Sequence, residues 1–138
     1  MKILPSYIIK ESCKALLPIN HMNYQTIVET TTEKFYVKKT PFEIIKESCL
    51  QYFSSYEGRR EAVKYMTGYT HKSPIPISTT LHIYAFPTLS PSHPDCIWFF
   101  SHHIKKIEEL TDKYTSDYRT IVHFRDGSTL KTDISSYI

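Results

Sequence analysis

Four cations are concentrated in one short stretch of the sequence. Residues 58–72 contain a single acid, Glu61, and four basic residues: Arg59, Arg60, Lys64 and Lys72. This stretch carries a net charge of +3, equal to the formal charge of the whole chain, so the remaining residues sum to zero. A positive patch on a neutral body attracts polyanions such as nucleic acids. We therefore select these four residues as candidate DNA contacts, with a solvated basic helix face as the alternative.

Tyrosines alternate with these cations along the same stretch. Tyr56, Tyr65 and Tyr69 stand beside the basic residues, where aromatic rings either stack on bases or simply pack. Arginine suits phosphates and the narrow, strongly negative minor grooves of A-tracts. The pattern contains no helix-turn-helix or zinc-finger spacing, so it indicates an anionic partner without naming a binding motif.

The histidines, cysteines and glycines of the chain lack the spacing that a metal site or a phosphate-binding loop needs. The closest approach to a metal site is the group His93, Cys96, His102 and His103, whose spacing matches no standard zinc pattern. The three glycines form neither a dinucleotide-binding nor a phosphate-binding loop. We predict no metal, no cofactor and no catalytic residues, and the enzyme class is disfavoured.

The three cysteines are odd in number and widely spaced. Cys13, Cys49 and Cys96 form no C-x-x-C pair, so they are interpreted as buried, reduced thiols rather than a disulfide framework. A Cys–His nucleophile is the alternative, but no family signature surrounds any of the three. Together with the absence of a long apolar run or a signal peptide, this predicts a cytoplasmic protein with no membrane segment.

The elements that must position the cations are two predicted helices. Thr40-Pro41-Phe42-Glu43 has the arrangement of a capping box, with Pro at the first helical position. Apolar residues then follow at helical spacing: Phe42, Ile45, Cys49, Tyr52 and Phe53. Ser54 or Ser55 is expected to cap a second helix over about 56–66, with Gly68 as its stop and a buried face of Ala62, Val63 and Met66.

Short β-prone runs flank this helical segment on both sides. Before it we expect strands at Tyr7–Ile9, Ala15–Leu17, Tyr24–Val28 and Phe35–Val37. After it we expect strands at Thr79–Phe86 and Cys96–Phe100, separated by a loop at Pro87–Asp95. The segment His102–Leu110 is either strand or short helix, and a hairpin closes on Asp126-Gly127 between Tyr118–Phe124 and Thr129–Ile134.

These elements define the expected fold class. It is α+β, with antiparallel β-strands flanking a central two-helix segment: strands about 7–37, helices about 41–67 and strands about 79–134. At 138 residues, one domain covering 1–138 is the expectation. A hexamer at Ile8–Cys13 recurs at Ile44–Cys49, and its flanks predict a strand for the first copy and a helix for the second.

Four blocks of the sequence, in this order and spacing, resemble the ComK competence transcription factor family. They are FSSYEGRR at 53–60, HKSP at 71–74, FPTLS at 86–90 and PDCIW at 94–98. The resemblance covers roughly residues 7–138. It implies a bacterial transcriptional activator of competence genes that binds double-stranded DNA at paired AT-rich boxes, chiefly through the minor groove.

The resemblance also implies partners. Family members act with RNA polymerase, assemble as homodimers or tetramers on DNA, and are delivered to a Clp protease by an adaptor. They typically continue past the point matching 134–138, and the adaptor-recognition segment lies in that tail, so this chain is expected to lack it. A protein-interaction module that does not bind DNA, but binds the adaptor or a sister activator, is the alternative function.

Overall fold

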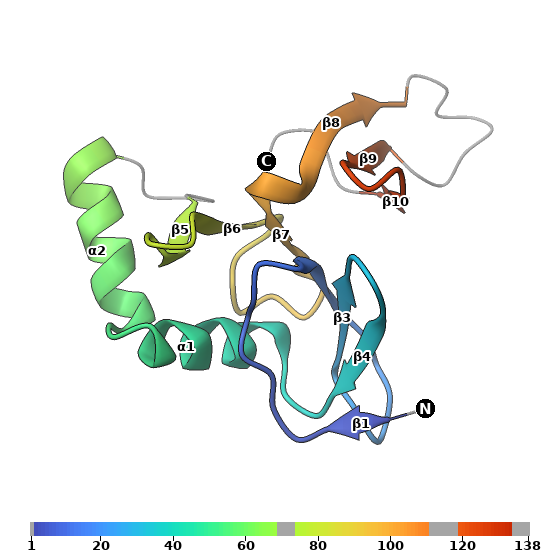
Figure 1. Ribbon diagram of the computed structural model, residues 1–138, viewed down its shortest axis with the longest axis horizontal. Helices are drawn as coiled ribbons and strands as arrows, with labels where there is room; N and C mark the ends of the chain where they lie inside the picture. Colours follow the sequence, from blue (N-terminus) through green and yellow to red (C-terminus); the bar gives the residue numbers. More distant parts are fainter. Residues whose placement is uncertain (1, 69–73, 111–118, 134–138) are drawn as a thin grey trace. The chain divides into compact units, whose positions relative to one another are not determined.

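The computed structural model describes residues 2–68, 74–110 and 119–133. Internal contacts divide the chain into two compact units, Met1–Ser101 and His102–Ile138, each described by itself below. The expected organisation as one domain stays a prediction. The α+β class is confirmed, since two helices lie between groups of strands (Figure 1).

The first unit is built on a seven-stranded sheet among the described residues. Its order is β1-β4-β3-β2-β7-β6-β5, antiparallel throughout except for the β1–β4 pair. The strands are β1 (Ile3–Leu4), β2 (Cys13–Pro18), β3 (Thr26–Thr30), β4 (Lys34–Val37), β5 (Ile75–Ser78), β6 (Ile83–Pro87) and β7 (Trp98–Phe100). Strand β5 therefore forms one edge of the sheet.

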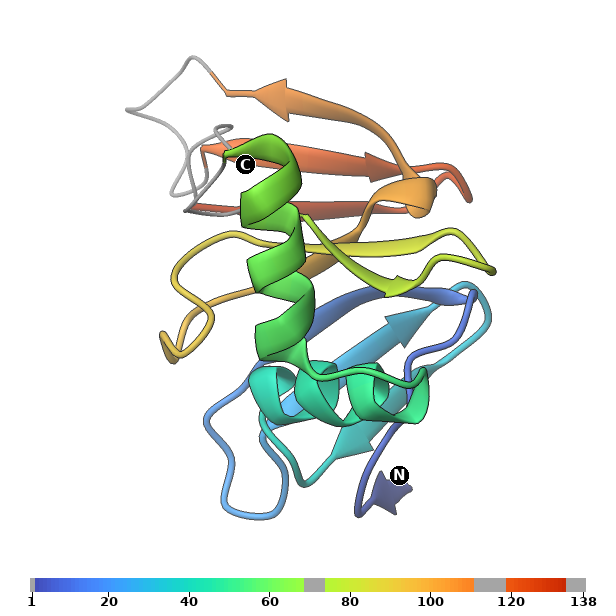
Figure 2. The same ribbon diagram turned by 90° about the vertical axis from the view of Figure 1, so that its left-hand side faces the viewer.

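Two helices, α1 (Pro41–Gln51) and α2 (Tyr56–Thr67), lie on the same face of this sheet (Figure 2). The core between helix and sheet contains fully buried Ile44 and Ile45 from α1 and fully buried Leu16 and Trp98 from the strands. Helix α1 thus supplies the apolar stripe that its sequence predicts. The exception is Phe53, which is 96% exposed because the chain turns there with a φ of 76°.

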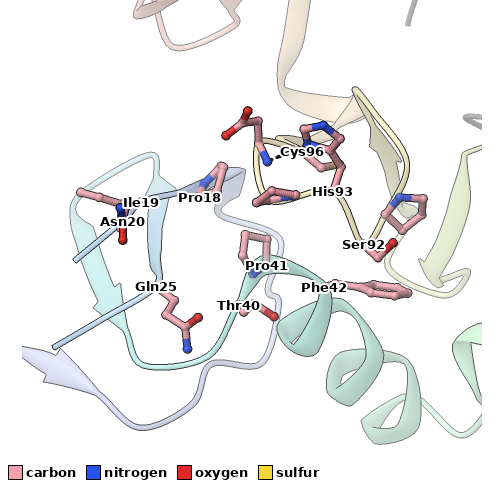
Figure 3. A pocket seen from close by; sticks show the side chains of 13 residues that line it. Pro18, Ile19, Asn20, Gln25, Thr40, Pro41, Phe42, Ser92, His93 and Cys96 are labelled. Carbon is pink, nitrogen blue, oxygen red and sulfur yellow. Dashed lines mark hydrogen bonds between the residues drawn. The ribbon is translucent and has the colours of Figure 1, made fainter. Parts of the chain in front are cut away.

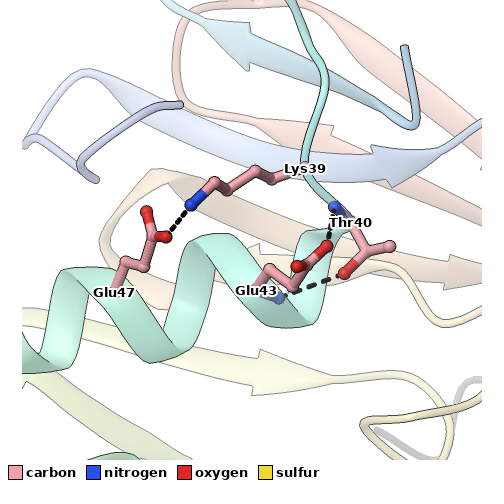
Figure 4. Close-up of polar contacts among 4 residues, drawn as sticks. All are labelled: Lys39, Thr40, Glu43 and Glu47. Carbon is pink, nitrogen blue, oxygen red and sulfur yellow. Dashed lines mark hydrogen bonds and ion pairs between the residues drawn. The ribbon is translucent and has the colours of Figure 1, made fainter. Parts of the chain in front are cut away.

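The predicted start of α1 is confirmed. The Thr40 hydroxyl accepts from the Glu43 backbone N–H at 3.2 Å, and the Glu43 carboxylate accepts from the Thr40 N–H at 3.0 Å. A neighbouring ion pair, which was not predicted, joins Lys39 to Glu47 one turn further on (Figure 4). The capping box depends on residues close in sequence, which is why a sequence pattern detects it, whereas the helix ends at Gln51, before the expected Ser54 or Ser55.

The second unit contains a three-stranded antiparallel sheet in the order β10-β9-β8. Its strands are β8 (Ile104–Glu109), β9 (Thr120–Phe124) and β10 (Thr129–Thr132), preceded by a 3₁₀ turn, η1 (Ser101–His103). The predicted hairpin is confirmed for its described part, with Gly127 at a φ of 92° in the turn. Tyr118 and Ile134, at its expected ends, lie outside the described residues.

Two strand predictions are wrong. Residues Tyr7–Ile9 have no strand pairing, because the Ile9 N–H donates to the Ser48 hydroxyl of α1 instead of to a neighbouring strand. The run Thr79–Phe86 is a turn followed by β6, and the missing strand is β5, which contains Pro76. Proline is tolerated there because β5 is an edge strand, where one side of the backbone needs no ladder partner.

The segment His102–Leu110 contains both predicted states in succession. It begins with η1 and continues as β8. Of the two copies of the repeated hexamer, the second is helical, whereas the first is a non-strand segment and turn that enters β2 only at Cys13. In the described parts of the chain, neither helix is long and apolar enough to cross a membrane.

Candidate nucleic-acid interface

Helix α2 carries three of the four predicted DNA contacts. It begins at Ser55, whose side-chain hydroxyl accepts from the Gly58 N–H at 3.0 Å. It ends at Gly68, which takes the left-handed conformation at a φ of 78° and donates its N–H to the Lys64 carbonyl at 2.8 Å. Glu57 in the first turn and Lys64 in the last turn both match the helix dipole.

One face of α2 packs against the rest of the first unit. Tyr56 is buried, with its ring edge-on to the rings of Phe42 and Trp98, and Val63 is half-buried against the core. The predicted buried face of Ala62, Val63 and Met66 is therefore wrong for two of its members. Ala62 is exposed because it points about 100° away from Val63, and Met66, in the last turn of the helix, is 77% exposed.

Arg59 points into the body of the first unit. One terminal nitrogen, Nη1, donates to the carbonyls of Pro76 and Ile77 on β5, at 2.6 and 2.9 Å. The other, Nη2, donates to the carbonyls of Cys49 and Tyr52 at the end of α1, at 3.2 and 2.8 Å. The side chain is half-buried, and the terminal nitrogens that would bind phosphate already hold backbone oxygens. A DNA contact by Arg59 stays a prediction that competes with this structural role.

Arg60 and Lys64 are exposed and lie one helical turn apart. Burial raises the pKa of the Tyr56 hydroxyl, and the nearby Arg60 guanidinium opposes that rise through its charge and a hydrogen bond. Tyr56, Arg60 and Lys64 thus follow one another at four-residue spacing along a single flank of α2. Lys72, the fourth predicted contact, lies outside the described residues.

The structure separates Arg59 from Arg60 although they are adjacent in sequence. Successive residues on an α-helix point about 100° apart, so the two side chains leave opposite flanks of the face of Tyr56 and Val63 that meets the core. The sequence contains no signal for the difference, since Arg59 lies three residues after Tyr56 and four before Val63, whereas Arg60 lies four after Tyr56 and three before Val63. The two arginines differ because backbone carbonyls of α1 and β5 lie within reach of Arg59.

A separate pocket of about 620 Å³ lies at the start of α1. Figure 3 shows that its side chains come from the chain following β2, from the start of α1 and from the loop before β7. The lining includes four prolines and one acid, Asp95, and it contains no lysine or arginine. This composition does not suit an anionic ligand, so the pocket is a poor candidate for binding the nucleic-acid backbone.

Cys13 and Cys49 are unsuited to nucleophilic chemistry. None of the three cysteines forms a disulfide, and all three are buried, as predicted. Burial raises the pKa of the Cys49 thiol to about 11, against the opposing influence of Arg59, and burial also raises the pKa of Cys13. A thiol with a raised pKa holds its proton at neutral pH, and the thiolate is the nucleophilic form. Across residues 2–68, 74–110 and 119–133, no group of three or more His, Cys, Asp or Glu side chains could hold a metal ion.

Comparison with known proteins agrees with the sequence blocks. A family model described as "ComK protein" matches residues 4–138. The chain is also 34% identical, over 134 residues, to the "Competence transcription factor" of Bacillus subtilis (strain 168). That alignment covers 96% of this chain and 67% of the relative, and no solved structure matches. The similarity supports a role for this chain as a competence transcription factor and gives no support to an enzymatic activity. Because the family match extends over nearly the whole sequence, the chain belongs to the ComK protein family.

Proposed function

We propose that this protein binds double-stranded DNA and activates the transcription of competence genes. Family membership and the name of the Bacillus subtilis relative support the transcriptional role. The observation that carries DNA binding is the pair Arg60 and Lys64, exposed one turn apart on a helix that Tyr56 and Arg59 attach to the rest of the first unit. Two cations held one helical turn apart are suited to neutralising phosphates of the DNA backbone.

On this proposal the recognised sites are AT-rich boxes read chiefly through the minor groove. Arg60, Lys64 and the predicted contact Lys72 supply affinity through the phosphates, which carry no sequence information. The preference for AT-rich sequences then comes from the narrow minor groove of A-tracts and from the ease with which the DNA deforms. Assembly as a homodimer or tetramer would multiply the small charge of one copy, and RNA polymerase would be the partner on the promoter.

The test is fluorescence anisotropy with two labelled duplexes across a salt series. One duplex contains two spaced A/T boxes, and the other is GC-rich and of equal length. We expect tighter binding to the AT duplex and a steep loss of affinity with salt. Replacing both Arg60 and Lys64 with Ala should lower the slope of log K against log salt by about 0.9 for each phosphate that the variant no longer neutralises. Equal affinity for both duplexes at low salt would contradict the proposal.

A second candidate function is a protein-interaction module, for which the Clp-protease adaptor or a sister activator is the proposed partner. The observation favouring it is a set of exposed apolar side chains on and between the helices: Leu50 at 63%, Phe53 at 96%, Tyr65 at 87% and Met66 at 77% exposure. Exposed apolar side chains mark a protein-binding surface where they form one contiguous patch. The same anisotropy series separates the two candidate functions. The interaction module predicts no preference for the AT-rich duplex over the GC-rich one, and no change in DNA affinity when Arg60 and Lys64 are replaced.

A further inference from the structure

Arg59 connects three elements of the first unit. Its backbone belongs to α2, and its guanidinium contacts the end of α1 on one side and the edge strand β5 on the other. Its two terminal nitrogens hold backbone oxygens, while Nε is buried without a partner among the described residues. The side chain is thus committed to the interior contacts of the fold.

Arg59 adds a cation to the end of α1, where the Cys49 carbonyl also accepts from the backbone N–H groups of Tyr52 and Ser54. The last carbonyls of a helix lack intrahelical partners, and the C-terminus carries a partial negative charge. Helix α1 has no basic residue in its own last turn, and it ends at Tyr52 rather than at a glycine. Arg59 donates to the carbonyls of Cys49 and Tyr52, so a residue of α2 supplies the positive charge that α1 lacks.

The same side chain also bonds strand β5, at a point where its ladder is irregular. Its pairing with β6 shifts register between Pro76 and Ser78, which leaves Ile77 outside the regular ladder. Arg59 donates to the Ile77 carbonyl at 2.9 Å and to the neighbouring Pro76 carbonyl at 2.6 Å. It therefore bonds the irregular part of an edge strand that has no further strand beside it in the described sheet.

We infer that Arg59 is a positioning residue, which sets the orientation of α2 and acts on DNA only through Arg60 and Lys64. The planar guanidinium reaches four oxygens in two directions, a geometry that the compact ammonium group of lysine cannot reproduce. Loss of this geometry frees α2 to tilt on its remaining contacts, and the two exposed cations lose their placement. This inference rests on the proposed function, since it assumes that Arg60 and Lys64 meet phosphates.

The test compares Arg59→Lys with the matched control Arg125→Lys, at an exposed arginine outside α2. Both changes keep the charge, and binding to the AT-rich duplex is measured below the melting temperature of each folded variant. We expect Arg59→Lys to bind about tenfold more weakly, equivalent to about 1.4 kcal/mol, and Arg125→Lys to stay within about twofold of the unchanged protein. Arg59→Lys binding within about twofold of the unchanged protein would overturn the inference.

A double-mutant cycle separates positioning from direct contact. In a protein already carrying Arg60→Ala and Lys64→Ala, Arg59→Lys should change affinity by less than about twofold, because the residues through which it acts are gone. A direct phosphate contact by residue 59 would instead keep its full effect in that background, and this result would contradict the inference. A role confined to stability would lower the melting temperature without changing the affinity of the folded protein, which would contradict it as well.

One measurement needs no variant and covers the case in which Arg59→Lys fails to fold. The ¹⁵N-resolved Nε–H resonances of the arginines in the unchanged protein are followed during titration with the AT duplex. We expect the Arg60 signal to shift and the Arg59 signal to stay close to its starting position. A larger shift at Arg59 would overturn the inference, whereas absence of any DNA binding would overturn the proposed function itself.

Discussion

The two helices of the first unit follow each other in sequence but serve different purposes. Helix α1 buries Ile44, Ile45, Ser48 and Cys49 completely. Helix α2, of similar length, buries only Tyr56 among its residues and exposes Tyr65 and Met66. The starts of the helices differ too. Helix α1 has a reciprocal capping box, whereas at the start of α2 the Ser55 hydroxyl accepts a single hydrogen bond from the Gly58 N–H.

This contrast shows where the protein can carry a function. Residues of α1 are constrained by packing, so changes there affect stability. Residues on the exposed sides of α2 contribute little to the core, and their side chains are available to a partner. The cations of α2 are therefore better candidates for recognition than those that support α1, such as Lys46, whose ammonium lies 4.4 Å from the centre of the Phe42 ring.

The largest effect should come from shortening a buried side chain of α1. Replacing fully buried Ile45 with Ala should lower the free energy of unfolding by about 2–5 kcal/mol, because it removes apolar contacts and leaves a cavity. Met66→Ala on α2 is the matched control and should stay within about 0.5 kcal/mol. Denaturant unfolding measures both, and equal losses would remove the distinction between the helices.

A smaller loss is expected at a buried polar contact of α1. The Ser48 hydroxyl is buried and accepts the Ile9 N–H at 3.0 Å. Ser48→Ala leaves that donor without an acceptor, which should cost about 1–3 kcal/mol in the free energy of unfolding. Ser54→Ala, at an exposed position after α1, serves as the control and should be close to neutral. A neutral Ser48→Ala would show that the Ile9 N–H finds another acceptor.

The cap of α1 should contribute about 1 kcal/mol. Thr40→Ala removes the hydroxyl that accepts the Glu43 N–H, whereas Thr40→Ser keeps it. We expect the alanine variant to unfold at lower denaturant concentration and the serine variant to match the unchanged protein within a few tenths of a kcal/mol. Equal behaviour of the two variants would mean that the hydroxyl does not stabilise the helix.

The smallest effect should be a pH dependence that comes from the capping box of α1. The pKa of Glu43 is lowered, mainly by its hydrogen bond to the Thr40 backbone, so the folded state favours the carboxylate. The resulting stability is fully present above the ordinary pKa of 4.5 and is lost as the pH falls through the lower folded-state value. Unfolding measured from neutral to acid pH should show a shallower decline for Glu43→Gln.

Helix α2 has no matching capping box, because Gly58 occupies the position of Glu43 in its first turn. A pH dependence as steep in Glu43→Gln as in the unchanged protein would assign the acid sensitivity to other carboxyl groups.

The sequence by itself determined the features that depend on near neighbours. The cap at Thr40, a cap at Ser54 or Ser55, the stop at Gly68 and the Asp126-Gly127 turn were all predicted, because each is made by residues within a few positions of one another. The α+β class follows from the same local periods. The blocks at 53–60, 71–74, 86–90 and 94–98 predicted the family without any structure.

Only the tertiary structure decided which β-prone or cationic residues face which partner. Pro76 lies in a strand because β5 is at an edge, and Ile9 is not in a strand because Ser48 takes its N–H. Arg59 and Arg60 look equivalent in sequence, yet the carbonyls that hold Arg59 come from residues 7 to 18 positions away. Such contacts form only when distant segments are brought together, so no local pattern separates the positioning arginine from its exposed neighbour.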